Sequence, residues 1–135
     1  MASIVLKRGQ TLASVQQQIG TIQAGLSFHA VENLQKALNL PLEKIATFLG
    51  MSRATLHRRK TRGKIASAES EKLIRYQRLL EKAREVFGDA ESARNWLTQP
   101  QRGLGGAKPI EFAKTELGAR EVENLLGRIE YGVYS

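Results

Sequence analysis

Apolar residues recur along most of this chain every three or four positions, which is the repeat of an α-helix. The pattern is longest in residues 68–87, where Leu73, Leu80 and Phe87 follow one another at intervals of seven. Only residues 3–6 suggest the alternation of a β-strand. The pattern therefore predicts an all-α fold, with an N-terminal helix-turn-helix bundle followed by a small helical domain.

The limits of the helices follow from capping residues and glycines. Ser27, Ser52 and Asp89 stand where N-caps are needed, because their short oxygen side chains can accept from free backbone N–H groups. The predicted helices are 11–24, 28–38, 42–49, 53–62, 68–87, one after Asp89 that holds Trp96 and Leu97, a brief one opened by Pro109, and a last one with Val122, Leu125, Leu126 and Ile129. Two modules result, 1–65 and 66–135.

Two of these helices carry an apolar side whose neighbour the sequence does not identify. The first helix has Leu12, Val15, Ile19 and Ile22 on one side. The long helix has a seam of Leu73, Tyr76, Leu80, Ala83 and Phe87. Such a seam forms either the core of a helical bundle or a surface on which two copies pair.

Residues 42–59 meet the steric requirements of a helix-turn-helix unit. Ala46 is small enough to let the second helix cross closely, and Gly50, four positions later, can take the left-handed conformation that the turn needs. Met51 and Leu56 are then expected to point inward. A helix of this kind reads the major groove of DNA when its outward side chains suit base edges and phosphates.

The charge of the chain points to the same segment. Residues 1–68 carry ten Lys and Arg against two acids, whereas residues 69–135 carry eleven of each. Six of the basic residues lie between 53 and 64 without an acid among them. An anionic partner, DNA above all, is expected at this helix. The predicted DNA-binding residues are Ser52, Arg53, Thr55, Arg58, Arg59, Lys60, Arg62 and Lys64. Arg62 and Lys64 are expected to contact the DNA backbone.

The composition argues against several other classes of protein. Cysteine is absent, which excludes disulfides and thiolate zinc sites and is typical of the cytoplasm. No stretch has the length of a membrane span or the form of a signal peptide. His29 and His57 are the only histidines, and no set of residues resembles a catalytic site. We therefore expect no enzyme activity, no cofactor and no metal.

Three blocks in the second half carry a family resemblance. They are GDAESARNWL at 88–97, LGGAKPIE at 104–111 after Pro100, and GAREVENLLGRIEYG at 118–132. Together they resemble the toxin-binding domain of the Xre/MbcA/ParS antitoxins, in which a helix-turn-helix module of the Xre type comes first. The resemblance covers nearly the whole chain.

The resemblance implies a type II antitoxin without catalytic activity. Its partner would be a RES-domain toxin that degrades NAD+, whose active site the C-terminal region of the antitoxin blocks. The complex would repress its own promoter. A homodimer is expected because helix-turn-helix proteins generally contact two half-sites.

The end of the chain is the expected toxin contact. Val133 and Tyr134 keep apolar surface at a terminus, and tyrosine rings with polar tips suit a partly hydrated interface. The predicted toxin-binding residues are Arg128, Glu130, Tyr131, Val133, Tyr134 and Ser135. The alternative is that this tail folds back on its own core.

Two other functions remain open at the level of the sequence. One is a free-standing repressor of the phage type, in which residues 66–135 only mediate oligomerisation. The other is an RNA-binding or other basic adaptor. RNA recognition would favour exposed aromatic residues among the basic ones, and residues 52–64 contain none.

Overall fold

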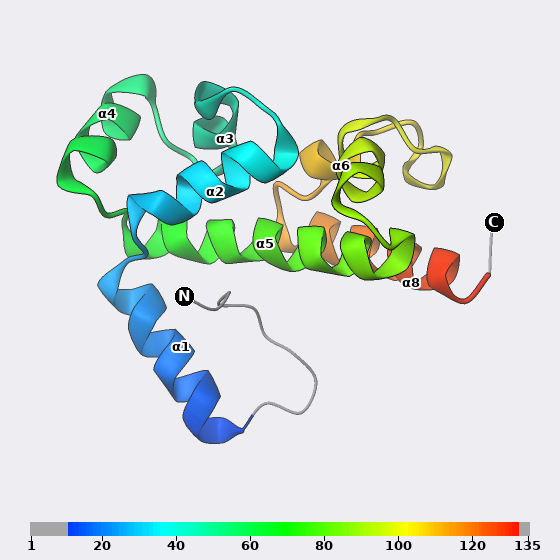
Figure 1. The fold of residues 1–135 in the computed structure, drawn as a ribbon, viewed down its shortest axis with the longest axis horizontal. Helices are drawn as coiled ribbons and strands as arrows, with labels where there is room; N and C mark the ends of the chain where they lie inside the picture. The colour runs from blue at the N-terminus through cyan, green and yellow to red at the C-terminus, as the bar shows by residue number, and fades with distance from the viewer. Residues whose placement is uncertain (1–10, 133–135) are drawn as a thin grey trace. The chain divides into compact units, whose positions relative to one another are not determined.

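The computed structural model describes residues 11–132, and within that range it contains helices and no strand (Figure 1). The α-helices are α1 (Leu12–Ala24), α2 (Phe28–Leu38), α3 (Leu42–Phe48), α4 (Arg53–Arg62), α5 (Ser67–Phe87), α6 (Ala90–Thr98), α7 (Pro109–Phe112) and α8 (Glu116–Glu130), with a 3-10 turn at Arg102–Leu104. The predicted all-α fold is confirmed. None of the described helices is long and apolar enough to span a membrane.

The chain forms two compact units, Met1–Gln77 and Arg78–Ser135. The division falls inside α5, whereas the sequence suggested a limit at residue 65. The difference arises because the first half of α5 belongs to the core of the first unit. There the ring of Tyr76 lies 5.4 Å from that of Phe48 on α3, centroid to centroid.

The core of the first unit is built mainly from one face each of α2, α3 and α5. Ring packing and apolar burial of this kind supply most of the stability of a small helical domain. Its buried apolar residues are Leu26, Phe28, Val31, Leu34, Leu38, Ile45, Ala46, Phe48, Leu49, Met51, Leu56, Ile65, Leu73, Ile74 and Tyr76.

A short backbone pairing joins the start of α2 to the end of α4. The N–H of Ile65 donates to the carbonyl of Leu26 at 2.9 Å, and the N–H of Phe28 donates to the carbonyl of Gly63 at 3.0 Å. The N–H of Leu26 also donates to the buried hydroxyl of Ser70 on α5, at 2.9 Å. Both ends of the segment that follows α4 are therefore fixed to the core.

The second unit packs α6, α7 and α8 with the second half of α5. Its buried residues include Leu79, Leu80, Ala83, Ala93, Leu97, Leu104, Ile110, Ala113, Ala119, Val122, Leu125 and Leu126. Trp96 is half-buried and its ring packs at a tilt against that of Phe87, with centroids 5.7 Å apart. Within both units the α5 seam is a core feature, since four of its five residues are buried and only Phe87 is partly exposed.

Helix α1 is the exception to this packing. The helix has an N-cap, because the hydroxyl of Thr11 accepts from the N–H of Ser14 at 3.1 Å. Yet no residue of α1 is buried. Leu12 is 74% exposed and Ile19 is 46% exposed. The apolar side predicted for this helix is present, but Leu12 and Ile19 on it are exposed and Val15 and Ile22 are only half-buried.

Candidate functional site

The turn between α3 and α4 has the geometry that the sequence predicts. Gly50 takes a φ of +76°, in the left-handed region that favours glycine. The N–H of Met51 donates to the carbonyl of Ala46 at 2.8 Å, which closes the turn. Ala46 is buried, so the two helices approach closely at a residue without bulk. The helix-turn-helix prediction is confirmed.

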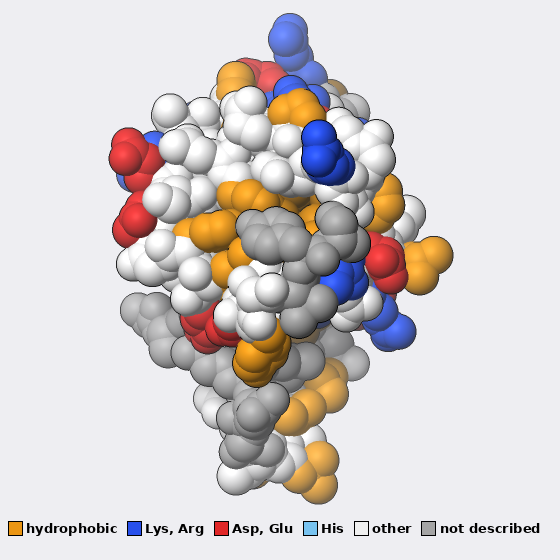
Figure 2. All heavy atoms as spheres, turned by 90° about the vertical axis from the view of Figure 1, so that its right-hand side faces the viewer, with side chains coloured by type: hydrophobic (Ala, Val, Ile, Leu, Met, Phe, Trp, Pro, Cys, Tyr) orange, Lys and Arg blue, Asp and Glu red, His pale blue; other side chains and the backbone are white. Residues whose placement is uncertain are grey.

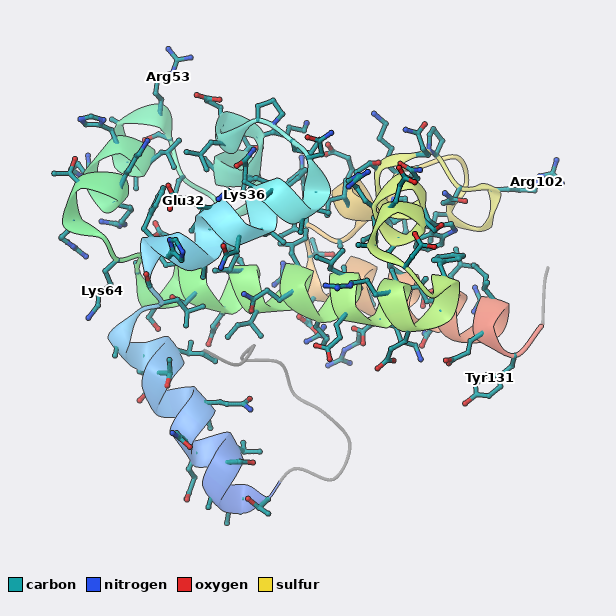
Figure 3. The ribbon with its side chains drawn as sticks, in the orientation of Figure 1. Glu32, Lys36, Arg53, Lys64, Arg102 and Tyr131 are labelled. Atoms are coloured by element: carbon teal, nitrogen blue, oxygen red, sulfur yellow. The ribbon has the colours of Figure 1, made fainter. Side chains whose placement is uncertain are left out.

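Helix α4 presents most of its surface to solvent, since Leu56 is its only buried residue. The positive side chains projecting from it and from the segment after it include Arg53 and Lys64 (Figure 3). Of the predicted DNA-binding residues, the exposed ones are Ser52, Arg53, Arg58, Lys60, Arg62 and Lys64, and Thr55 is half-buried. The structure therefore brings these residues together on one helix and its C-terminal extension.

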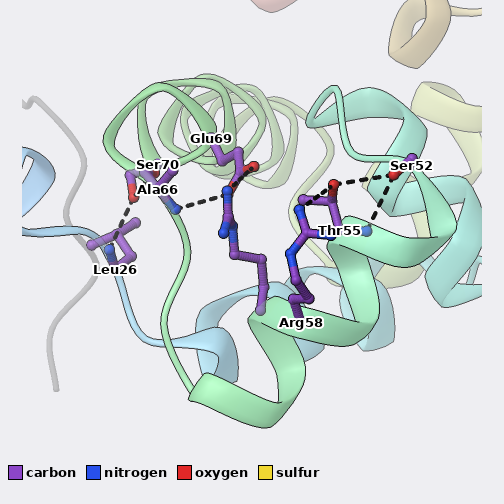
Figure 4. A network of polar contacts seen from close by, with 8 residues as sticks. Leu26, Ser52, Thr55, Arg58, Ala66, Glu69 and Ser70 are labelled. Atoms are coloured by element: carbon purple, nitrogen blue, oxygen red, sulfur yellow. Dashed lines mark hydrogen bonds and ion pairs between the residues drawn. The ribbon is translucent and has the colours of Figure 1, made fainter.

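The first turn of α4 holds a small polar network (Figure 4). The hydroxyl of Ser52 caps the helix by accepting from the N–H of Thr55 at 3.1 Å, and it donates to the hydroxyl of Thr55 at 3.1 Å. Nη2 of Arg58 donates to the same Thr55 oxygen at 3.2 Å. The network positions the Arg58 guanidinium next to a helix N-terminus, where anions bind favourably.

Arg58 also borders a shallow depression on the outer face of α4. The other residues that line this depression are His57, Thr61 and Arg62. A guanidinium pair beside a hydroxyl and an imidazole offers several hydrogen-bond donors to a phosphate or a base edge. The depression thus lies on the helix that is predicted to contact DNA.

Arg59 departs from the expectation that it faces outward. Its Nε donates to Oε1 of Glu69 on α5 at 2.9 Å, and its Nη2 donates to Oε2 at 3.3 Å (Figure 4). The exposed fractions of the two side chains are 18% and 11%. The same carboxylate accepts from the N–H of Ala66 at 2.7 Å. Arg59 therefore connects α4 to the core rather than presenting a charge to solvent.

The electrostatics of this pair follow from its surroundings. Burial alone would raise the pKa of Glu69, but the hydrogen bonds from Arg59 and from the Ala66 N–H outweigh it and lower the pKa. The hydrogen bond to Glu69 raises the pKa of Arg59. Glu69 was not predicted as part of the site, because an acid in the first turn of a helix is an ordinary feature of sequence.

We expect Glu69→Gln to lower the melting temperature at pH 7 and to have a smaller effect in acid. Because the folded pKa of Glu69 is lowered, its contribution is present above the ordinary carboxyl pKa of about 4.3 and is lost as the pH falls through the folded value. Thermal unfolding at pH 7 and at acid pH measures the two differences. Glu71→Gln, at an exposed position of α5, is the control and should change neither. An equal decrease in the melting temperature of Glu69→Gln at both pH values would contradict this account.

The second unit offers a different surface, in which charged residues are mostly paired with one another. Arg78 donates to Glu123 at 3.0 Å and to Glu116 at 3.1 Å. Nζ of Lys82 donates to Oε1 of Glu130 at 2.8 Å. That hydrogen bond raises the pKa of Lys82. Since both partners of the last pair are about two-thirds buried, Glu130 stabilises α8 against α5.

The predicted toxin-binding residues divide into three groups in the structure. Tyr131 follows α8 and is 80% exposed. Figure 3 shows its side chain pointing away from the helix. Arg128 is half-buried, and the Glu130 side chain is about one-third exposed and accepts from Lys82. Val133, Tyr134 and Ser135 lie outside the described residues. Among the described members, Tyr131 alone offers an exposed aromatic ring.

Two exposed apolar residues of this unit were missed from the sequence. Leu117 is 75% exposed and Phe112 is 38% exposed. The exposure of Leu117 could have been predicted, because Leu117 lies outside the apolar face of α8 formed by Val122, Leu125 and Leu126. Figure 2 shows hydrophobic side chains that reach the surface among charged ones on one face of the molecule. Apolar groups of this kind are typical of protein interfaces when they gather in patches.

Both halves of the chain match models of known protein families. The Antitoxin Xre/MbcA/ParS C-terminal toxin-binding domain matches residues 82–132. The Antitoxin Xre-like helix-turn-helix domain matches residues 17–78.

Similar proteins are also named as antitoxins. A protein of Yersinia enterocolitica named Antitoxin Xre is 34% identical over 119 residues, which cover 87% of this chain and 80% of the relative. Another Antitoxin Xre, from Photorhabdus laumondii, is 34% identical over 116 residues, covering 84% and 78%. A Sphingobium protein named Prs ADP-ribosylating antitoxin is 25% identical over 133 residues, covering 91% and 84%.

Proposed function

Because the chain belongs to the Xre antitoxin family, we propose that it neutralises a cognate RES-domain toxin that degrades NAD+ and represses its own operon through α3 and α4. The observation that carries this proposal is the presence, in one chain, of a basic helix-turn-helix and of a domain that matches the family's toxin-binding module. A plain repressor has no need of the second. The chain itself supplies binding and no chemical step.

DNA contact is assigned to the exposed side of α4 and to the segment after it. Ser52 and Thr55 can hold a phosphate at the helix N-terminus, and Arg58 can pair with a guanine edge. Arg62 and Lys64 are assigned to the DNA backbone. Arg53 and Lys60 are exposed on the same helix and complete the surface. Arg59 is assigned a positioning role through Glu69 in place of a DNA contact.

Toxin contact is assigned to the end of the chain. Tyr131 supplies an exposed ring, and Val133, Tyr134 and Ser135 extend the contact beyond the described residues. Arg128 lies one turn before Tyr131 and is assigned to the rim of the interface. Glu130 contributes indirectly, because its bond to Lys82 fixes the end of α8. In this proposal the tail enters the toxin's active site and excludes the substrate.

Operator binding in this proposal requires two copies of the chain. A helix-turn-helix dimer places two recognition helices about one turn of DNA apart, or a multiple of it, which doubles the contacts on a palindromic site. We therefore assign the repressor form as a homodimer.

The name of the Sphingobium relative favours a second candidate, in which the toxin neutralised by this chain is linked to ADP-ribosylation of a protein. Both candidate chemistries break the bond between nicotinamide and ADP-ribose, so loss of NAD+ does not separate them. NAD+ labelled in its adenosine part separates the two chemistries. The label passes to free ADP-ribose if the toxin hydrolyses NAD+, and to a protein if the toxin modifies one.

Deletion of residues 133–135 tests the proposed neutralisation. We expect the shortened chain to keep its helical content, because α8 ends at Glu130, and to release toxin activity when the two proteins are co-expressed. Growth and cellular NAD+ would both fall. A chain of unchanged length with Val133→Ser and Tyr134→Ser should behave in the same way if the apolar tail is the blocking element. Full protection by the shortened chain would rule the tail out.

A further inference from the structure

We propose that α1 is the surface on which two copies of this chain associate, by pairing with α1 of the second copy. The inference builds on the homodimer of the proposed function and gives that dimer a location.

The first observation is that α1 has an apolar side with no fully buried residue. Its apolar residues, Leu12, Val15, Ile19 and Ile22, are exposed or half-buried. The helix projects away from α2 and α4 in Figure 1. Isolated helices of about this length are marginal in water, and a stable one normally buries its apolar side against another element. Helix α1 therefore needs another surface against which to bury its apolar side.

The second observation is the spacing of the four residues. The intervals are three, four and three positions, which is the a and d repeat of a coiled coil. This narrow seam suits one partner helix of the same kind, whereas a helix that faces a globular core has a wider apolar stripe.

The third observation is charge, and it selects a second copy over another partner. Helix α1 contains no charged residue, although the chain carries a net charge of +8. The positions that flank the seam are Gln16, Gln18 and Gln23. An amide side chain both donates and accepts hydrogen bonds, so a glutamine flank is complementary to an identical flank. Two such helices meet without the repulsion that two copies of α4 would experience.

The exit of α1 from the first unit is defined by its geometry. Gly25 has a φ of +91°, and a side chain at this position would collide with the carbonyl oxygen of Ile65. The next residue, Leu26, is fixed by its bonds to Ile65 and Ser70. The link between α1 and the DNA-binding helices is therefore a short one, so pairing of α1 would bring two copies of the first unit together.

The other exposed apolar residues do not form a comparable seam. Leu117 lies in the first turn of α8 and Tyr131 follows its last. A helix of 15 residues spans roughly 22 Å, which separates the two by most of the unit. Among the described α-helices, α1 alone has no buried residue.

Sedimentation velocity of the full chain, without toxin or DNA, tests the proposal. We expect a dimer whose dissociation constant rises about a hundredfold or more with Ile19→Glu, because two carboxylates would meet in an apolar seam. Gln17→Glu places the same charge on the opposite side of α1 and should leave the constant unchanged. Neither variant removes a buried side chain, so both are expected to stay folded by circular dichroism.

Disulfide trapping tests the contact directly, because the natural chain contains no cysteine. Ile19→Cys should cross-link two copies if the helices are parallel. A mixture of Val15→Cys and Ile19→Cys should cross-link preferentially if they are antiparallel. Gln17→Cys is the matched control and should stay uncross-linked.

Two results would overturn the proposal. One is a chain that stays monomeric at all concentrations, which would assign the α1 stripe to the toxin or to residues 1–10. The other is a dimer that Ile19→Glu leaves intact. Neither result depends on toxin neutralisation, which is measured separately with the deletion of residues 133–135. A dimer that Ile19→Glu dissociates would support α1 pairing even if no toxin were neutralised.

Discussion

Gly118→Ala is expected to disrupt the second unit and to abolish toxin neutralisation. Gly118 lies in the first turn of α8, and a methyl group there would collide with the carbonyl oxygen of Phe112. Backbone cannot move aside as a flexible side chain can, so we expect a loss of about 3 kcal/mol or more in the free energy of unfolding. For a unit of this size the melting temperature should fall by at least about 10 °C.

The same helix supplies a matched control. Gly127 also lies in α8, but no atom outside its own helix lies within 4 Å of a methyl group added there. Gly127→Ala should therefore raise the stability by up to about 1 kcal/mol, the difference in helix propensity between the two residues. Calorimetry of both variants measures the contrast. Equal melting temperatures for the two would show that the α7–α8 junction tolerates a side chain.

Removing three exposed guanidinium groups from the α4 surface is expected to abolish specific binding to operator DNA. Arg53, Arg58 and Arg62 are exposed, and none of them pairs with an acid in the described part of the chain. If each contributes about 1–3 kcal/mol, the triple alanine variant should bind at least a hundredfold more weakly. Binding should also depend less on salt, with the logarithmic slope reduced by about 0.9 for each phosphate that the variant no longer neutralises.

A control variant with the same loss of charge separates the loss of DNA contacts at α4 from a general effect of net charge. Arg84, Lys114 and Arg120 are exposed residues of the second unit. Changing all three to alanine lowers the net charge equally but leaves α4 intact. Fluorescence anisotropy with an operator duplex at several salt concentrations compares the two variants. An equal loss of affinity in both would place the DNA contact outside α4.

The local features of the fold could be predicted from the sequence because they depend on neighbouring residues. The caps at Ser27, Ser52 and Asp89 each require only an oxygen placed two or three positions before a free N–H. The same holds for the left-handed turn at Gly50. The helical repeat similarly identified four buried residues of α5, namely Leu73, Tyr76, Leu80 and Ala83.

The long-range pairings could not be predicted in this way. Arg59 and Arg58 are adjacent and chemically identical, yet one is held by Glu69 and the other bonds to Thr55. Which of the two turns inward depends on where α5 passes α4, and no local pattern encodes that. The pairing of Glu130 with Lys82 is of the same kind, since the two residues are 48 positions apart. Residue type identified the charged residues that could bind a partner. Only the fold shows which of them are exposed and which are paired within the protein.

The anchoring of α4 affects how operator binding should respond to temperature. The helix is capped by Ser52 at its start, joined to α5 by Arg59 and Glu69, and followed by a segment paired with the backbone of Leu26. Little conformational entropy then remains to be lost when α4 docks. Calorimetric titration should consequently show a heat capacity change set by the buried surface alone, without the larger value that accompanies folding coupled to binding.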